Sequence, residues 1–211
     1  MPAFPGKARR FGVLLGLLAL LAAAASPAGA MTFKLQELPD GRAALTARGP
    51  ILSGDAQRMF EYVKTLDKIR HIAVVVVDSP GGVVDEAEQM ALLIHNVGLP
   101  VAVGGDATCG SACVLLFAAA QRRAAASGAM IGVHRASLGG SETKSTLDAT
   151  DGMVANCEFY GVPAAIIAKM RNTPPGGVTW LTHEDLALMH VEIYEPPPGP
   201  AAARLSAADE R

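Results

Sequence analysis

Residues 71–82, HIAVVVVDSPGG, constrain the fold more than any other part of this sequence. Positions 73–77 are five consecutive apolar residues, and four of them are valine. β-Branched residues favour strands, and a strand without polar alternation is typically buried on both faces, as in a parallel sheet covered by helices. The segment therefore predicts a central strand of an α/β fold.

Short segments with strand or helix periodicity surround this strand. Two alternating segments flank a proline and a glycine at 39–41, so we predict a hairpin of residues 32–38 and 42–49. Further along, strands and helices alternate in short units, which indicates a mainly parallel central sheet. The expected units are a helix that begins at Ser53 or Asp55 and buries Met59, Val63 and Leu66, a helix after Gly82, a strand at 101–105, a helix over 108–120 and a strand at 131–137.

The last third of the chain is expected to be helical and to end in a disordered tail. Residues 137–150 are polar and rich in glycine, serine and threonine, which predicts a loop or mobile arm. A helical region over roughly 150–171 follows, and then a short helix in WLTHEDLALMH that Thr182 caps. Residues 196–211 are rich in proline and alanine without an apolar period, so we expect them to be disordered.

The N-terminal segment has the three parts of a secretory signal peptide. Lys7, Arg9 and Arg10 precede the apolar stretch GVLLGLLALLAAAA, and small residues follow up to Ala30. This stretch is shorter than the roughly 20 residues of a membrane span, so cleavage after Ala30 is preferred over an uncleaved anchor. We therefore expect residues 1–30 to be a signal peptide and 31–195 to form one domain, periplasmic or secreted, with no membrane attachment after cleavage.

Composition and charge argue against several kinds of ligand. The formal net charge is −2 without a basic run, and aromatic residues make up 5% of the chain, so nucleic acid is not an expected partner. The three cysteines and five histidines lack the paired short spacings of a zinc site. No metal and no cofactor is expected.

Three segments that can carry chemistry follow consecutive predicted strands: 78–82, 109–112 and 132–134. The carboxyl ends of strands in open α/β sheets are where ligands bind. Ser111 lies between small residues at a strand-to-helix transition, and a serine hydroxyl becomes a nucleophile when a neighbouring base takes its proton. His134 is the candidate base. The amides of Gly82 and Ala112 are candidate donors of an oxyanion hole.

Together, DSPGG, CGSAC and MIGVHRA resemble the proteolytic subunit of Clp protease and its exported relatives in the ClpP/crotonase superfamily. The intervals of 30 residues from Gly81 to Ser111 and 23 from Ser111 to His134 fit that family's order of oxyanion glycine, nucleophile and base. The resemblance covers roughly residues 45–195. It implies a crotonase/ClpP-like spiral fold with a helical arm, Ser111 as nucleophile, His134 as general base, and the Gly82 and Ala112 amides as the oxyanion hole.

The sequence departs from the family at the third member of the triad. Where the family has an aspartate, this chain has Val178 and Thr179. The third member is therefore left open between Thr179, which can accept a hydrogen bond, and the nearby acid Asp185.

A second departure is the pair of cysteines around Ser111. Export would expose the cysteines to an oxidising compartment, where disulfides form. A disulfide between Cys109 and Cys113, a bridge that involves Cys157, and three reduced thiols are all left open.

The leading hypothesis is an exported serine hydrolase, specifically a Clp-protease-like peptidase with a Ser-His dyad that acts on peptides or proteins. The missing aspartate motivates an alternative: a catalytically weak or inactive protein of the same fold that binds a partner or a small acyl ligand. An acyl-CoA enzyme and a Ser-Lys dyad through Lys144 or Lys169 rank lower. The family assembles into rings through the arm after the histidine, so the resemblance also implies a homo-oligomer.

Overall fold

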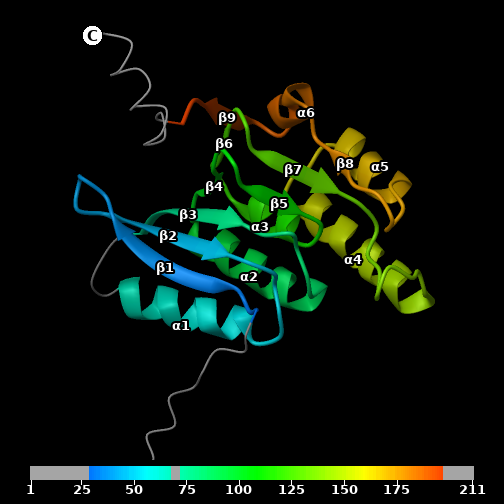
Figure 1. Cartoon of the computed structure of the whole chain (residues 1–211), viewed down its shortest axis with the longest axis horizontal. Helices are drawn as coiled ribbons and strands as arrows, with labels where there is room; N and C mark the ends of the chain where they lie inside the picture. Colours follow the sequence, from blue (N-terminus) through cyan, green and yellow to red (C-terminus); the bar gives the residue numbers. More distant parts are fainter. Residues whose placement is uncertain (1–28, 68–71, 197–211) are drawn as a thin grey trace, which may run out of the picture.

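The computed structural model of the chain describes residues 29–67 and 72–196. Nearly all of the expected signal peptide and of the expected C-terminal tail lie outside these residues. Within them the chain forms a mixed α/β fold with two sheets and six helices, shown in Figure 1. No helix in this described part is long and apolar enough to cross a membrane.

The larger sheet is parallel apart from its first strand. Strand β1 pairs antiparallel with β2, which confirms the predicted hairpin, and every later neighbour pairs in parallel. The valine-rich strand β3 lies between β2 and β4, and its Val75 and Val77 are fully buried. In spatial order the strands are β1 (Thr32–Glu37), β2 (Ala43–Arg48), β3 (Ile72–Asp78), β4 (Val101–Val103), β6 (Arg123–Ala126) and β9 (Val191–Tyr194).

A smaller sheet adjoins the end of β3. It contains β5 (Thr108–Gly110), β7 (Met130–Val133) and β8 (Thr179–Trp180), with β5 parallel and β8 antiparallel to β7. A backbone bridge between Ser79 and Cys109 joins this sheet to the residue that follows β3. The carboxyl ends of β3, β5 and β7 therefore meet at one corner of the molecule.

Helix α3 is the centre of the helical layer. It lies between α2 and α4, and all of its residues are buried, as expected for a helix that is apolar all round. In the view of Figure 1, α1 runs beneath β1 and β2 with α2 next to it. The helices are α1 (Asp55–Asp67), α2 (Val84–Val97), α3 (Cys113–Ala119), α4 (Lys144–Phe159), α5 (Ala164–Asn172) and α6 (His183–Leu188).

One sequence-based expectation about the helices after β7 was wrong. The predicted loop over 137–150 is helical from Lys144 onward, because Thr143 and Thr146 form a capping box that begins α4 there. The helical region predicted over roughly 150–171 is confirmed, and it consists of two helices. Gly161, with φ of 77°, ends the first, and Pro163 precedes the second.

Other differences concern the start of α1 and short strands. The backbone amides of Gly54 and Ala56 donate to Glu86 of α2, so a distant acid rather than Ser53 caps α1. The predicted helix over 108–120 begins as strand β5. Strand β6 was missed because the sequence of 123–126, RAAA, has neither β-branched residues nor alternation.

Candidate active site

The Ser79–Gly82 turn after β3 lies directly against the turn that carries Ser111. Ser79 is fully buried, and its Oγ accepts a hydrogen bond of 3.1 Å from the Gly81 amide. A Cβ atom at Gly81, whose φ is 96°, would lie 2.7 Å from the Ser111 Cβ and 2.9 Å from the Ala112 nitrogen. Only glycine allows this approach, so the turn and the candidate nucleophile are packed together.

Ile51 fixes the orientation of Gly82. The Ile51 amide donates to the Gly81 carbonyl at 2.8 Å, and the Val83 amide donates to the Ile51 carbonyl at 2.9 Å. In this parallel bridge Ile51 bonds to the residues on either side of Gly82, so the N–H and C=O of Gly82 itself point away from Ile51. The Gly82 N–H therefore faces away from Ile51, where it can meet a ligand.

Ser111 has an unusual backbone conformation. Its φ of 54° lies in the left-handed region, which costs a residue other than glycine about 1 kcal/mol. The Ser111 amide donates to the Gly132 carbonyl of β7 at 3.0 Å, and α3 begins two residues later. Such a sharp strand-to-helix turn exposes a side chain at the sheet edge, and the first amides of the helix have no partner within it. Ser111 is partly exposed, whereas its neighbours Gly110 and Ala112 are buried.

His134 directly follows β7 and is half-buried. Its Nδ1 lies 2.7 Å from the Arg135 carbonyl oxygen. A carbonyl only accepts hydrogen bonds, so Nδ1 carries the proton and Nε2 of the neutral ring has a free lone pair. This is the tautomer that a general base requires. The Gly132 carbonyl, which accepts a hydrogen bond from the Ser111 amide, is two residues before His134 in the chain. Two residues of a strand span about 7 Å.

Arg135, whose carbonyl orients His134, is itself held by four hydrogen bonds. Its guanidinium binds both carboxylate oxygens of Glu142, at 2.5 and 3.0 Å, and donates to the Arg171 carbonyl at 2.8 Å. Its amide donates to the Thr173 carbonyl at 2.9 Å. The hydrogen bond from Arg135 lowers the pKa of Glu142, so this carboxylate is ionised at neutral pH. Sequence reasoning missed Arg135 because a backbone acceptor has no residue-type signal.

Within the described residues, neither Thr179 nor Asp185 is a hydrogen-bond partner of His134. The Thr179 hydroxyl bonds with that of Thr173 at 2.6 Å. Asp185 accepts hydrogen bonds from Lys169 at 2.5 Å and from the Thr182 amide at 2.9 Å. Burial alone would raise the pKa of Asp185, but these hydrogen bonds outweigh it and lower the pKa. Among these groups, the hydrogen-bond partner of His134 Nδ1 is the Arg135 main-chain carbonyl and neither of the two predicted side chains.

The two lysines of the Ser-Lys alternative are engaged elsewhere. Lys169 binds Asp185, and the exposed Lys144 binds Asp148 at 2.7 Å. Asp78, the acid before the glycine turn, is also structural, because it pairs with Arg48 at 2.9 Å and accepts from the Thr108 amide. In the described part of the chain no cluster of His, Cys, Asp and Glu is placed to hold a metal ion.

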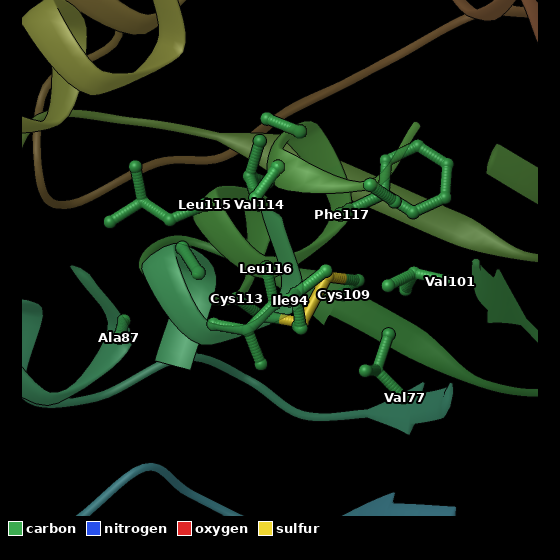
Figure 2. Packing of buried hydrophobic residues seen from close by; sticks show 14 of the residues in the cluster. Val77, Ala87, Ile94, Val101, Cys109, Cys113, Val114, Leu115, Leu116 and Phe117 are labelled. Carbon is green, nitrogen blue, oxygen red and sulfur yellow. A yellow bond between two sulfur atoms is a disulfide. The ribbon is translucent and has the colours of Figure 1, made fainter. Parts of the chain in front are cut away.

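A disulfide joins Cys109 to Cys113, with 5.2 Å between the two Cα atoms. Both cysteines are fully buried, and they belong to the same hydrophobic cluster as Ile94 of α2 and Val77 of β3, which Figure 2 labels. Cys157 is a free buried thiol, and its burial raises the pKa to about 12. The structure therefore has the Cys109–Cys113 disulfide, which was one of the three arrangements of the cysteines that the sequence left open.

The two sheets, the buried helix and the serine at a strand-to-helix turn define a ClpP-like α/β fold. No protein-family model matches the chain, and no curated protein matches its sequence. Three solved structures with the same fold are ClpP1 from Listeria monocytogenes, a mutant of the membrane-bound stomatin-specific protease 1510-N, and the catalytic domain of the ClpP protease from Plasmodium falciparum.

These structures match most of the chain at low identity. Listeria ClpP1 has a TM-score of 0.57 and 18% identity over 73% of this chain and 92% of its own. The stomatin-specific protease has a TM-score of 0.55 and 20% identity over 72% and 78% of the two chains. The Plasmodium domain has a TM-score of 0.53 and 16% identity over 72% and 85%. The likeness establishes the fold that the sequence resemblance implied.

Proposed function

We propose that this chain is a serine hydrolase, specifically a Clp-protease-like peptidase, with Ser111 as nucleophile and His134 as general base. One observation carries the proposal. The glycine turn packs against Ser111 and Ala112, while the Ser111 amide is bound to the strand that ends at His134. Segments 30 and 23 residues apart in sequence thus supply a nucleophile, a base and main-chain donors at one corner.

The mechanism follows from these positions. Nε2 of His134 takes the hydroxyl proton as Ser111 Oγ attacks the carbonyl carbon of a bound peptide. The amides of Gly82 and Ala112 donate to the oxyanion that forms, and each such donor contributes about 2.7–4 kcal/mol. His134 then protonates the leaving amine, and water hydrolyses the acyl-enzyme in a second half-reaction.

The Arg135 carbonyl supports this chemistry less strongly than a carboxylate would. It keeps the proton on Nδ1 and so maintains the tautomer, which is one role of the triad aspartate. Its partial charge stabilises an imidazolium less than a full negative charge does. We therefore expect slower turnover than in enzymes with a complete triad.

The setting of the enzyme is part of the proposal. The sequence before Ala30 supports export to the periplasm or beyond, with Met31 as the first residue of the mature protein. No ATP-driven unfoldase works there, so short or unfolded peptides are the proposed substrates. The family resemblance supports a homo-oligomer assembled through residues 137–159.

A fluorophosphonate probe tests the catalytic proposal, because it phosphonylates an activated serine. Wild-type protein should be labelled on Ser111, as located by peptide mass spectrometry, and Ser111→Ala should not be labelled. His134→Gln should be labelled far more slowly. Ser127→Ala, which removes a serine bonded to Glu195 on the surface, is the matched control and should be labelled at the wild-type rate.

Absence of labelling across several probes and pH values would contradict the proposal. It would favour the second candidate, a protein of the same fold that binds a partner or a small acyl ligand without turnover. The observation behind that candidate is the carbonyl in place of a carboxylate beside His134. In that case, binding partners captured by the wild type would also be captured by Ser111→Ala.

A further inference from the structure

The turn that carries Ser111 is enclosed by a covalent ring. Cys109 belongs to strand β5 and Cys113 is the first residue of α3, so the disulfide closes a loop around Gly110, Ser111 and Ala112. The candidate nucleophile and one candidate oxyanion donor both lie inside this loop.

The two sides of the turn are anchored differently. On the strand side, the Gly110 amide donates to the Ser79 carbonyl at 3.0 Å and the Ser111 amide donates to the Gly132 carbonyl at 3.0 Å. On the helix side, the Val114 amide bonds back to the Ser111 carbonyl within the turn itself. The disulfide is the cross-link that ties the start of α3 to the anchored strand.

Opening the disulfide would act mainly on the turn. Two thiol sulfurs cannot stay at bonding distance, so they must separate to van der Waals contact. Both cysteines are fully buried in the hydrophobic core that Figure 2 shows, and the side chains of a close-packed core have little room to move. The turn is held less firmly on its helix side, because the Val114 amide bonds only within the turn and the partly exposed Ser111 is in a disfavoured conformation, so the turn can relax more easily than the core.

We propose that Cys109 and Cys113 are positioning residues for Ser111, and that formation of their disulfide as the chain folds in an oxidising compartment switches the active site on. This inference rests on the function proposed above. In the forward direction the two thiols lose two protons and two electrons to a disulfide oxidant, which is reduced to two thiols. A dithiol reductant reverses the reaction and becomes a disulfide itself.

The switch would keep the enzyme inactive until it reaches an oxidising compartment. Thiols stay reduced in the cytosol, whereas disulfides persist in exported proteins. With the pair reduced, Ser111 Oγ and the Ala112 amide shift relative to Gly82 and His134. A displacement of about 1 Å at reacting groups costs on the order of 10²-fold in rate.

The test compares fluorophosphonate labelling rates of the full chain in its two redox states. Dithiothreitol in sub-denaturing urea opens the buried disulfide, and both reagents are then removed without oxygen while a control sample receives urea alone. Alkylation of denatured samples should detect one thiol, Cys157, in the oxidised form and three in the reduced form. We expect the oxidised form to be labelled about 10²-fold faster at saturating probe, with unchanged probe affinity.

Three variants separate positioning from stability. Cys109→Ala with Cys113→Ala should be labelled slowly in both conditions, without a response to dithiothreitol. Cys157→Ala should keep the full response. Ile166→Val, a buried change in α5 remote in sequence from the turn, lowers the melting temperature but should keep the wild-type labelling rate.

Each outcome decides one question. Equal labelling of the oxidised and reduced forms would overturn the switch, and so would a double variant as fast as the oxidised wild type. If neither form is labelled, the proposed hydrolase function fails and this inference fails with it. Circular dichroism of each sample establishes that the protein is folded. If the double variant does not fold, the labelling rates of the oxidised and reduced wild type alone decide whether the disulfide positions Ser111.

Discussion

At the scale of single residues, the two glycines after β3 have different roles. Gly81 allows the contact with Ser111 and Ala112, whereas Gly82 lies against Ile51. The first contact brings the candidate nucleophile to the turn, and the second turns the Gly82 amide toward the site. Both roles depend on the absence of a side chain.

Replacing Gly82 by alanine should therefore abolish most of the activity. The new Cβ would lie 2.0 Å from the Ile51 carbonyl oxygen, so the turn must shift and its amide must leave the oxyanion position. Loss of one such donor predicts a labelling rate about 10²–10³-fold lower, measured with the fluorophosphonate probe. Gly176→Ala, where a Cβ meets open space, should match the wild type, and a Gly82→Ala protein labelled at the wild-type rate would exclude this role.

The raised pKa of Glu88 predicts that the stability of the protein depends on pH. Burial, and then the nearby Asp85 carboxylate, raise the pKa of Glu88 above its ordinary value of 4.5, although Asn156 donates a hydrogen bond to it. Below pH 4.5 the side chain is protonated in the folded and unfolded states, so burial carries no charge penalty. As the pH rises through the raised pKa, the folded protein must ionise a disfavoured carboxylate and loses stability.

Glu88→Gln removes this penalty and keeps an acceptor for Asn156. Its melting temperature should exceed that of the wild type at pH 7, and the two should converge in acid. Thermal unfolding followed by circular dichroism across this pH range measures the difference. The exposed Glu192→Gln is the control and should show no such gain. A variant less stable than the wild type at pH 7 would show that the ionised carboxylate is favourable.

At the scale of elements, the segment between β2 and α1 supports the glycine turn. Ile51 bonds to both sides of Gly82, and the Asp55 carboxylate accepts from the Leu52 amide at 2.8 Å and from the Met31 amide at 3.3 Å. Asp55 is fully buried and forms an ion pair with Arg58. One acid thus links the first residues of the expected mature chain to the strand segment beside the site.

Asp55→Ala should destabilise the protein strongly. It removes the buried partner of a part-buried ion pair and leaves the Leu52 and Met31 amides without their acceptor, and each unsatisfied buried donor costs about 1–3 kcal/mol. Chemical denaturation measures the free energy of unfolding. Asp148→Ala, which breaks the exposed pair with Lys144, is the matched control and should have little effect. Equal effects of the two variants would contradict the structural role assigned to Asp55.

At the scale of the whole molecule, the arm after His134 is the proposed oligomer contact. Its Leu138 and Leu147 are 76% and 47% exposed in the single chain, so they offer apolar surface that a neighbouring chain would bury. We expect light scattering to give a mass that is a multiple of that of the chain, which is 21.8 kDa before any cleavage. Leu138→Glu with Leu147→Glu should reduce that mass to one chain. A wild-type monomer, or an unchanged mass in the double variant, would contradict this contact.

The segments that position the candidate site could be predicted because their signals are local. The valine run ends at Asp78, as the sequence indicated, and a strand precedes His134 as predicted, although β7 ends at Val133, earlier than the predicted strand over 131–137. Strand β5, which ends at Gly110, lies where a helix was predicted. The start of α4 could not be placed, since a Thr143–Thr146 capping box in a polar segment also fits a loop. Strand β6 could not be found because three of its four residues are alanine, and it is a strand only through its parallel neighbours β4 and β9.

The sequence by itself determined the α/β class, the central valine strand and the order of glycine turn, serine and histidine. These features rest on β-branching, periodicity and residue type, which act over a few residues. Only the tertiary structure decided which distant groups meet: Ile51 with Gly82, Gly81 with Ser111, and the Ser111 amide with the Gly132 carbonyl. These contacts join segments far apart in the sequence through main-chain atoms or through the absence of a side chain, so chain geometry had to select them.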